Sequence, residues 1–382
     1  MNARQRMLNT IAFNPVDRPF RWEAAGVWLA TADRWINEGL PPEAAADLPK
    51  YFNYDTINWL PIGSWTHEPF FPKFKNKVLA DEGKTLLITD HGVIKRVIKE
   101  DRNERMPQFI KYPVETLEDY ISIIEPRFYH DNPVYFNEKW DASLKTYENR
   151  DFVLGMYIIG PFGHLRNLMG DENLMYAMYD DPELIHYIME KWKTFYLGLL
   201  GRICRDVTPD IIMVWEDMCY KNGPLCSPAS YREFLMEPLG EVASLAKQFG
   251  IPGFFVDNDG DCSLMIPLYL EIGANGFFPF ECQSGMDIRK IREQYGKQFV
   301  IIGGIEKYAL ADEFSEDVMK REVFAKVVPM LKDGGFIPML DHSAPPNISY
   351  TRFCSFLKYI RELPVKYANG EIDNCGASGG FA

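Results

Sequence analysis

The sequence predicts an α/β fold, a (β/α)8 TIM barrel with a β-hairpin insertion in its N-terminal half. Short apolar runs alternate with segments of helical length, and eight of them centre near residues 20, 56, 152, 211, 253, 276, 299 and 336. Such runs are typical of parallel strands that are buried on both faces. Eight of them in 382 residues favour a closed barrel over an open sheet. The sequence has no GxGxxG or Walker pattern that would indicate a nucleotide-binding half.

The N-terminal elements are less regular. Residues 2–12 have the pattern of a short helix, and the strand near residue 20 leads directly to Glu23. The run 85–99 alternates apolar and polar residues around an Asp-His-Gly turn, which is the pattern of a β-hairpin. We therefore expect an antiparallel insertion over about residues 64–105.

From residue 152 onward, strand and helix patterns alternate regularly. Asp181-Pro182 and Ser227-Pro228 each place a capping side chain before a proline at the first helical position, which predicts two helix starts. We expect one barrel domain over residues 1–368. A tail rich in glycine and polar residues, 369–382, is expected to be loosely held.

Composition limits the classes of partner. The formal net charge of −13 argues against a nucleic-acid or anionic-membrane surface, since either needs a basic face. No apolar stretch reaches the roughly 18–20 residues that span a bilayer, and the N-terminus has no apolar signal-peptide core. Seven cysteines without a CxxC pair indicate reduced thiols. These features together predict a cytoplasmic enzyme.

Acidic residues follow two neighbouring predicted strands. Asp257 and Asp259 come after the run 253–256, and Glu281 follows the next run. Active sites of barrels are built at the carboxyl ends of the strands, and residues two apart on a strand project to the same side. Two carboxylates there would repel each other, so a cation or a shared proton is expected. The alternative is that Asp259 forms a turn and Asp261 caps a helix.

Other polar residues follow the remaining strands. His342 comes after the last strand, beside an aspartate that could orient its ring, and is expected to bind metal or act as an acid or base. Glu281 is a further candidate metal ligand or general acid. Asp217 is expected to orient ligands or to contact a polar substrate group, and Glu216 and His164 are candidate substrate contacts. The alternative for each of these acids is a solvated loop residue or a helix cap.

Aromatic residues also gather near the predicted strand exits. Glu23 and Trp22 follow the first strand and are candidate substrate contacts. Each aromatic residue alone is expected to be a packing residue, but together they indicate an apolar pocket that accepts an aromatic group. The set consists of Trp22, Trp28, Trp59, Trp65, Phe70, Phe71 and Trp215.

Several stretches, taken in order, resemble the uroporphyrinogen decarboxylase superfamily, a barrel family that includes corrinoid-dependent methyltransferases. They are RQRMLNTIAFNPVDRPFRWE from Arg4, VWEDMCYKNGPLCSPASYREFLMEP from Val214, VDNDGD from Val256, GGIEK from Gly303 and GGFIPMLDHSAPPNIS from Gly334. The resemblance covers the chain apart from the insertion and the tail, and it implies a homodimer.

The departures from the superfamily pattern are informative. The porphyrinogen decarboxylases have an arginine-rich RQAGRY loop after the first strand, where this chain has WEAAGVWLATADRW. Arg18 and Arg21 precede that position and Arg34 lies beyond it, so no arginine pair replaces the loop. Because a tetrapyrrole with many carboxylates needs a cationic clamp, uroporphyrinogen is not the expected substrate.

The methyltransferase branch has a zinc site of the form His-x-Cys-Gly, completed by a late cysteine. These positions fall on Asp257, Asp259 and His342 in this chain. The resemblance therefore implies a harder oxygen and nitrogen site, made from Asp257, Asp259, Glu281 and His342 in some combination. Zinc accepts such a set, and iron, manganese or magnesium stay open.

The resemblance implies a metal-dependent methyltransferase. It would move a methyl group from a methoxylated small molecule to a corrinoid protein, with Glu281, Asp217 and His342 as catalytic residues. The corrinoid would come from a partner, because this chain has no DxHxxG-like motif. One alternative is a decarboxylase or lyase that acts on a small acid without metal. A binding barrel without catalysis and a metal-dependent hydrolase are further alternatives.

Overall fold

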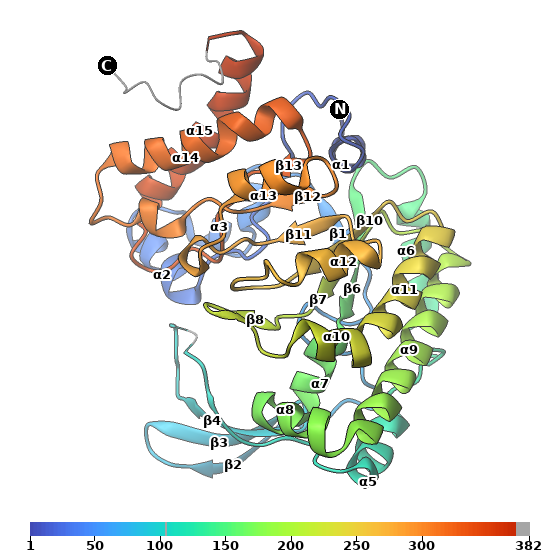
Figure 1. Ribbon diagram of the computed structural model, residues 1–382. Coiled ribbons are helices and arrows are strands. Elements are labelled where there is room, and N and C mark those ends of the chain that lie inside the picture. The colour runs from blue at the N-terminus through green and yellow to red at the C-terminus, as the bar shows by residue number, and fades with distance from the viewer. Residues whose placement is uncertain (104, 372–382) are drawn as a thin grey trace.

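The computed structural model describes residues 1–103 and 105–371, and its centre is a parallel sheet that curves into a TIM-like barrel (Figure 1). Residues 372–382, most of the predicted tail, lie outside the described residues. The strand order is β1-β6-β7-β10-β11-β12-β13, and every neighbouring pair is parallel. The strands are β1 (Ile57–Trp59), β6 (Val153–Ile159), β7 (Ile211–Trp215), β10 (Gly253–Asp257), β11 (Gly276–Phe278), β12 (Val300–Ile302) and β13 (Phe336–Ile337).

Helices cover the outer face of this sheet (Figure 1). The two predicted helix starts are confirmed, because the Asp181 carboxylate accepts from the Leu184 N–H and the Ser227 hydroxyl accepts from the Ser230 N–H. The helices are α1 (Ala3–Ile11), α2 (Leu29–Asn37), α3 (Pro42–Ala45), α4 (Leu48–Tyr51), α5 (Leu117–Asp119), α6 (Glu138–Tyr147), α7 (Pro161–Met169), α8 (Asp171–Asp180), α9 (Pro182–Cys204), α10 (Pro228–Phe234), α11 (Met236–Gln248), α12 (Ile266–Glu271), α13 (Ile288–Tyr295), α14 (Glu316–Asp333) and α15 (Tyr350–Ala368).

Two apolar clusters lie on the two faces of the sheet. The larger one fills the space between strands and helices, where Trp192 and Tyr231 are fully buried. The smaller one fills the barrel interior with inward-facing side chains, among them Phe20, Met213 and Phe255. Strands that are buried on both faces explain why the sequence shows continuous apolar runs there.

The predicted strand near residue 20 is not a strand among the described residues. Its segment closes the ring between β13 and β1 through single contacts. The Arg21 carbonyl accepts from the Asp55 N–H at 2.9 Å, and Glu23 accepts from the Leu340 N–H at 3.2 Å. Pro19 has no N–H to give to a ladder, which weakens strand pairing here. We call this junction the seam.

The insertion is an antiparallel sheet that stands apart from the barrel (Figure 1). The predicted hairpin is confirmed by β3 and β4, and their turn residues His91 and Gly92 have φ of 49° and 89°, as a tight hairpin turn requires. The last strand of this sheet, β5, lies beyond residue 105, where the insertion was expected to end. The strands are β2 (Lys77–Asp81), β3 (Thr85–Asp90), β4 (Val93–Ile98) and β5 (Gln108–Lys111), and a separate small hairpin joins β8 (Cys219–Tyr220) and β9 (Gly223–Pro224).

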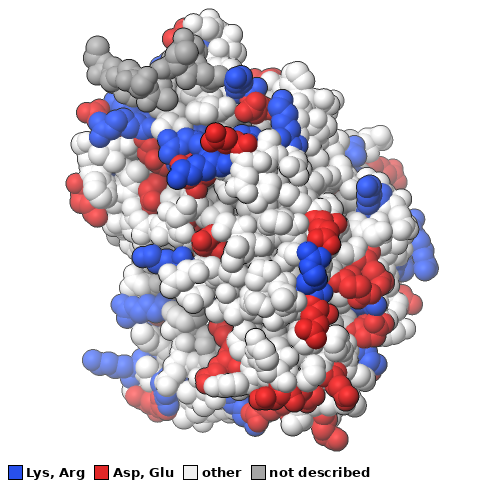
Figure 2. Space-filling model, viewed as in Figure 1, with Lys and Arg blue, Asp and Glu red and all other residues white. Residues whose placement is uncertain are grey.

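The charged surface residues and the cysteines can be compared with the expectations from composition. In the face that Figure 2 shows, acidic and basic side chains are interspersed. None of the helices in the described part of the chain is both long and apolar enough to cross a membrane. The cysteines within residues 1–103 and 105–371 are free thiols.

One buried carboxylate ties the N-terminal helix to the barrel. Asp210, which precedes β7, accepts from the Arg4 side chain at 2.9 Å, from Arg150 at 3.0 Å and from the Leu154 N–H at 2.9 Å. Its side chain is only 3% exposed and that of Arg150 is 9% exposed. A carboxylate in such a place is stabilised only because these donors surround it.

We predict that Asp210→Ala lowers the free energy of unfolding by about 3 to 5 kcal/mol, since it leaves the Arg150 guanidinium nearly buried without its partner. Urea unfolding followed by circular dichroism measures this. Asp180→Ala, on an exposed position of α8, is the matched control and should change stability by less than about 0.5 kcal/mol. Equal effects of the two substitutions would contradict the assigned role of Asp210.

Candidate functional site

Three predicted site residues converge at the carboxyl end of the barrel. Asp259, Glu281 and His342 each offer one ligand atom, and these atoms lie within 4.8 Å of one another. They follow β10, β11 and β13, so the ends of three strands place them. The His342 Nε2 lies 3.3 Å from the Asp259 Oδ2. We call this group the triad.

The two nitrogens of His342 have different partners. The Ser343 N–H donates to Nδ1 at 2.8 Å, so in this arrangement the ring proton is on Nε2 and points to Asp259. Burial alone would lower the pKa of His342, but the hydrogen bond and the charge of Asp259 outweigh it and raise the pKa. A doubly protonated ring would lose the Ser343 contact, so this contact favours the neutral ring.

Glu281 is held from two sides. Its Oε2 accepts from the Gly260 N–H at 2.9 Å, and its Oε1 lies 3.5 Å from the Lys307 ammonium. Gly260 has a φ of +69°, and a Cβ there would overlap the backbone of Tyr220, so only glycine fits this close approach. Lys307 therefore offsets part of the negative charge of the triad. The alternative in which Asp261 caps a helix is wrong. Its carboxylate accepts from the Ser263 N–H, whereas α12 begins only at Ile266.

Asp257 lies beside the triad but outside it. Its side chain is buried, and its Oδ2 accepts from the indole N–H of Trp65 at 2.6 Å. Burial raises the pKa of Asp257 well above its usual range, and the charge of Asp259 raises it further. The protonated form of Asp257 is therefore more favoured than that of an exposed aspartate, whereas Asp259 and Glu281 face the other members of the triad.

Asp217 is clamped by an arginine. Arg166, on α7, forms an ion pair with the Asp217 carboxylate and donates to its carbonyl at 2.8 Å. The residue has a φ of +43°, which turns the chain sharply after β7. Burial raises the pKa of Asp217 to about 7, while Arg166 lowers it and Asp259 raises it. Asp217 is thus linked to the triad by charge.

The structure places Glu216 and His164 away from the triad. Glu216 is fully buried behind β7, where it accepts from the Tyr231 hydroxyl at 2.7 Å and from the Phe162 N–H at 2.8 Å. Burial raises the pKa of Glu216 to about 7. His164 is also fully buried, and its Nδ1 lies 2.8 Å from the Glu68 carboxylate. Both side chains join helices and loops to the barrel.

Glu23 and Trp22 lie where the seam reaches the barrel mouth. Glu23 Oε2 accepts from the Leu340 N–H, while Oε1 has no partner among the described residues. Burial raises the pKa of Glu23 to about 8, and the charge of Asp341 adds to this effect. Glu23 is therefore mostly protonated at neutral pH.

A row of aromatic rings belongs to the cluster in the barrel interior and reaches Asp257, beside the triad, through Trp65. The ring centroids of Trp22 and Trp59 lie 6.5 Å apart, and Tyr157 stacks on Trp59 at 3.8 Å. Trp65 continues the row at 5.7 Å from Tyr157 and at 5.8 Å from Phe278. The four tryptophan and tyrosine rings are only partly buried. We call these five residues the aromatic row.

Gly155 makes room for the aromatic row. A Cβ at this position of β6 would overlap the Trp59 ring, so the ring lies directly on the backbone of the strand. A glycine inside an otherwise apolar strand signals this kind of close approach. That signal is in the sequence, but the sequence alone does not identify Trp59 as the ring that approaches Gly155.

A cleft of about 360 Å³ separates the insertion sheet from the barrel mouth. Asp217 and Trp215 line its barrel side, and Phe109 and Lys95 line its insertion side. Lys95 pairs with Asp90 at 2.8 Å, and Arg166 pairs with two carboxylates, so the cations of this cleft are already neutralised. The cleft suits an uncharged ligand better than a polycarboxylate.

A second group of ligand-type side chains lies behind the triad. Cys282, Glu306 and Asp341 lie within 4.8 Å of one another through their ligand atoms. The Asp341 oxygens accept from the N–H groups of Cys282 and Lys307, both at 2.9 Å. Burial raises the pKa of the Cys282 thiol beyond its usual range. These contacts hold the backbone of two strand exits in place.

The sequence did not indicate Arg166, Lys307 and Tyr157 as site residues, whereas Trp59 belongs to the aromatic set that was expected to form an apolar pocket. Arg166 and Lys307 lie on the segments after strand ends, as barrel site residues do. Arg166 follows β6 by two helical turns, which no local pattern distinguishes from a surface arginine. Tyr157 occupies an inward position of β6, two residues after Gly155.

Comparisons with known proteins agree with this architecture. The model of the family described as Uroporphyrinogen decarboxylase (URO-D) matches residues 98–363. A solved methyltransferase from Methanosarcina mazei aligns with a TM-score of 0.62 and 14% identity, covering 97% of this chain and 100% of that chain. At this identity the likeness shows the TIM-like fold alone. No curated protein matches the chain.

Two other solved structures align less well. A B12-independent methionine synthase from Shewanella sp. W3-18-1 has a TM-score of 0.36 at 10% identity, covering 60% of this chain and 66% of that chain. An endo-beta-1,4-xylanase from Gloeophyllum trabeum has a TM-score of 0.36 at 11% identity, covering 63% of this chain and 83% of that chain. Neither carries an argument about this chain.

We predict that Glu23 makes the protein less stable as pH rises. Its folded pKa of about 8 exceeds the ordinary value of 4.5, so the folded state binds the proton more tightly, and this stabilisation is lost as pH rises through 8. Glu23→Gln should remove this loss and should be more stable than wild type at pH 8.5, by on the order of 2 kcal/mol. Urea unfolding at pH 5.5 and pH 8.5 measures the difference. A variant that loses as much stability as wild type between these pH values would contradict the prediction.

Proposed function

The chain belongs to the uroporphyrinogen decarboxylase family, and from this premise we propose that it is a metal-dependent methyltransferase, which moves a methyl group from a methoxylated small molecule to a corrinoid protein. The observation that supports this most directly is the triad, in which three ligand atoms lie within 4.8 Å of one another at the barrel mouth. A methyltransferase from Methanosarcina mazei has the same fold.

The side chains of the triad fit a divalent cation. Two carboxylates and one imidazole are a donor set that zinc accepts, and it also suits iron or manganese. Asp259, Glu281 and His342 would bind the metal, with Asp257 as the nearest further carboxylate. When bound there, the metal would act as a Lewis acid on the ether oxygen.

The residues around the triad handle the proton that methyl transfer requires. When the methyl–oxygen bond breaks, the oxygen keeps the electron pair and needs a proton to leave as an alcohol or phenol. Burial raises the pKa of Asp257 and favours its protonated form, and Asp217, with a pKa of about 7, exchanges a proton near neutral pH. Arg166 fixes the Asp217 carboxylate in place. We assign general-acid duty to this pair of aspartates, with Glu281 as a further candidate.

The aromatic row suits a neutral, planar or apolar methyl donor. Its rings present apolar faces in the barrel interior beside the triad, and aromatic stacking contributes about 0.5 to 1.5 kcal/mol per pair. Arg18 and Arg34, which flank the loop after the first predicted strand, are bound elsewhere. Arg18 binds Asp55, Arg34 binds Glu38 and Asp312, and none of these three ion pairs includes a residue of the triad or the aromatic row. Uroporphyrinogen would therefore find no cationic clamp.

The methyl acceptor in this proposal is the corrinoid of a partner protein. The reduced cobalt of that partner would supply the nucleophile that takes the methyl group from the donor oxygen. The barrel mouth has to receive that cofactor, and the cleft beside the insertion sheet leaves this end of the barrel accessible. No corrinoid-binding DxHxxG-like motif occurs in this chain.

One observation supports a second candidate, a decarboxylase or lyase that acts without metal. The Ser343 N–H donates to His342 Nδ1, which leaves a proton on Nε2, and Lys307 already offsets the charge of Glu281. In this candidate His342 is a proton donor to Asp259 or to substrate. Metal content separates it from the methyltransferase.

We predict that His342→Ala lowers bound metal from about one per chain to well below one, and lowers methyl transfer about 100-fold or more, because one of three ligands is lost. Metal is measured by mass spectrometry of purified protein, and transfer is measured with a methoxylated arene and a reduced corrinoid protein. His186→Ala, on an exposed position of α9, is the matched control and should change neither quantity.

Unchanged metal content in His342→Ala would contradict the triad as the metal site. If the wild-type protein holds no metal and converts a small acid at a rate that a chelator does not change, the lyase is favoured instead. A metal-bound protein that transfers no methyl group with any tested donor would contradict the methyltransferase but not the triad.

We also predict that Trp59→Ala raises KM for an aromatic methyl donor about tenfold and changes kcat by less than about threefold, because Trp59 contacts bound substrate without taking part in bond breaking. Steady-state kinetics measures both constants. Tyr179→Ala, whose ring is 79% exposed on α8, is the control. A loss in kcat with KM unchanged would show that Trp59 does not bind the donor.

A further inference from the structure

An arginine cluster lies at the seam, at the opposite end of the barrel from the triad. Arg18 and Arg21 come from the segment before β1, and Arg361 comes from α15, which packs over the same junction. The three side chains line one small pocket together with Pro338 and Pro364. We call it the seam pocket. In a chain with a net charge of −13, a concentration of cations is unexpected.

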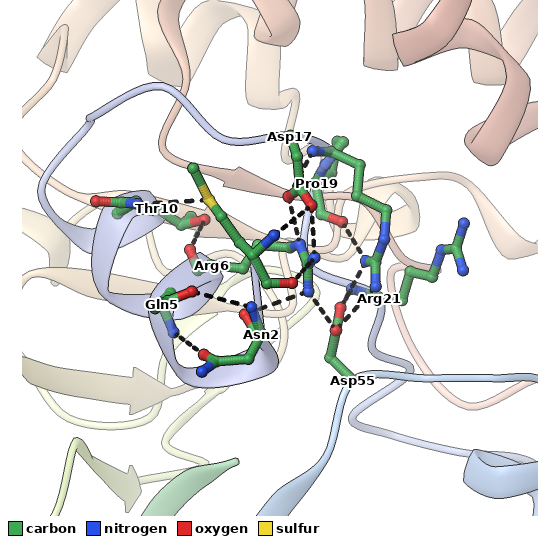
Figure 3. Close-up of polar contacts among 11 residues, drawn as sticks. Asn2, Gln5, Arg6, Thr10, Asp17, Pro19, Arg21 and Asp55 are labelled. Atoms are coloured by element: carbon green, nitrogen blue, oxygen red, sulfur yellow. Dashed lines mark hydrogen bonds and ion pairs between the residues drawn. The ribbon is translucent and has the colours of Figure 1, made fainter. Parts of the chain in front are cut away.

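The carboxylates near this cluster are already shared. Asp55 accepts from Arg6 at 2.6 Å and from Arg18 at 2.7 Å, while Asp17 also pairs with Arg6 at 2.8 Å (Figure 3). The Arg21 backbone N–H donates to Asp55 at 2.8 Å, but its side chain leads away from that carboxylate in Figure 3. The two carboxylates therefore pair with the side chains of Arg6 and Arg18 and with neither of the guanidinium groups of Arg21 and Arg361.

Two guanidinium groups have unused donors. The Arg21 side chain makes no hydrogen bond or ion pair to any described residue. The Arg361 Nε is buried without a partner, and the same side chain donates to the Phe52 carbonyl through a different nitrogen. A buried N–H without an acceptor costs about 1 to 3 kcal/mol, and the donors of Arg21, whose side chain is only partly buried, are the ones that an acceptor from outside the chain can reach.

The neighbouring cations also destabilise one another. Burial lowers the pKa of Arg21, and the charges of Arg18 and Arg361 lower it further. Burial likewise lowers the pKa of Arg361, and Arg18 adds to it. A bound anion would reverse both effects, because it stabilises the charged form of each guanidinium.

The shape of the seam pocket limits what it accepts. It has a volume of about 20 Å³, enough for one oxygen atom of a larger group. It shares Arg18, Pro19 and Pro364 with a groove of about 430 Å³, which Lys297 and Lys332 also line. A ligand could therefore place one oxygen in the seam pocket and the rest of its anionic group and body in the groove.

We propose that the seam pocket binds the phosphate group of a small molecule. Guanidinium forks match phosphate oxygens, and a tetrahedral group can place one oxygen among the arginines of the seam pocket while its other oxygens stay in the groove beside Arg18. The site lies at the junction where the parallel ladder is open, between residues 18–23 and β13. Binding there ties α15 to the seam and stabilises barrel closure. This inference does not depend on the proposed methyl transfer.

Titration of the full chain with inorganic phosphate by calorimetry, at constant ionic strength, tests the proposal. We expect saturable binding to wild type and at least a tenfold weaker affinity in Arg21→Gln and in Arg361→Gln. Arg21 has no side-chain partner, so its variant should fold like wild type, as circular dichroism will show. Arg232→Gln, an exposed arginine paired with Glu271, is the matched control and should keep the wild-type affinity.

Three outcomes would overturn the proposal. Phosphate binding that is equal in wild type and Arg21→Gln would mean an adventitious ion only. Tighter binding of acetate than of phosphate would assign the site to a carboxylate. If wild type shows neither binding nor a phosphate-dependent decrease of hydrogen exchange in α15, the seam pocket is not an anion site.

Discussion

The crowding of carboxylates at one end of the barrel is the constraint on which the site depends. Asp257, Asp259, Glu281 and Asp217 come from three strand ends that the parallel sheet necessarily brings together. Like charges in a partly buried place cannot all be ionised without compensation. The chain supplies some of it through Arg166 and Lys307. The carboxylates of Asp259 and Glu281 are the reason that we propose a cation at the triad.

The other half of the barrel mouth has the opposite chemistry. The aromatic row contributes apolar ring faces where the triad contributes charge, and Trp65 joins the two halves by its hydrogen bond to Asp257. Trp65 comes from the loop that leads into the insertion, so the insertion also shapes the catalytic end of the barrel. The proposed methyl donor has an apolar body and one polar oxygen. The body would contact the aromatic row, and the oxygen would face the triad.

The sequence predicted the barrel, and with it the meeting of Asp259, Glu281 and His342, because parallel strands in a barrel end on one side whatever the loops do. It could not predict which of the candidate site residues form hydrogen bonds or ion pairs with partners outside the triad. Glu216 is used by Tyr231 and a helix N-terminus, His164 by Glu68, and Asp257 by Trp65, and all three contacts join residues far apart in the chain. The predicted strand near residue 20 is absent for a similar reason. At the seam, Pro19 has no N–H to donate, and the Arg21 N–H donates to the Asp55 carboxylate instead of to a neighbouring strand.

His342 connects the charge of the triad to the backbone beside it. With the proton on Nε2, the ring donates to Asp259 and accepts the Ser343 N–H through Nδ1. A cation bound at Nε2 requires a lone pair there, so the proton has to move to Nδ1, where it faces the Ser343 N–H. The two N–H groups cannot both point at each other, and the ring or the backbone after β13 must turn. The Ser343 hydroxyl donates to the Ala25 carbonyl at 2.7 Å, so such a turn is transmitted to the segment that lines the seam.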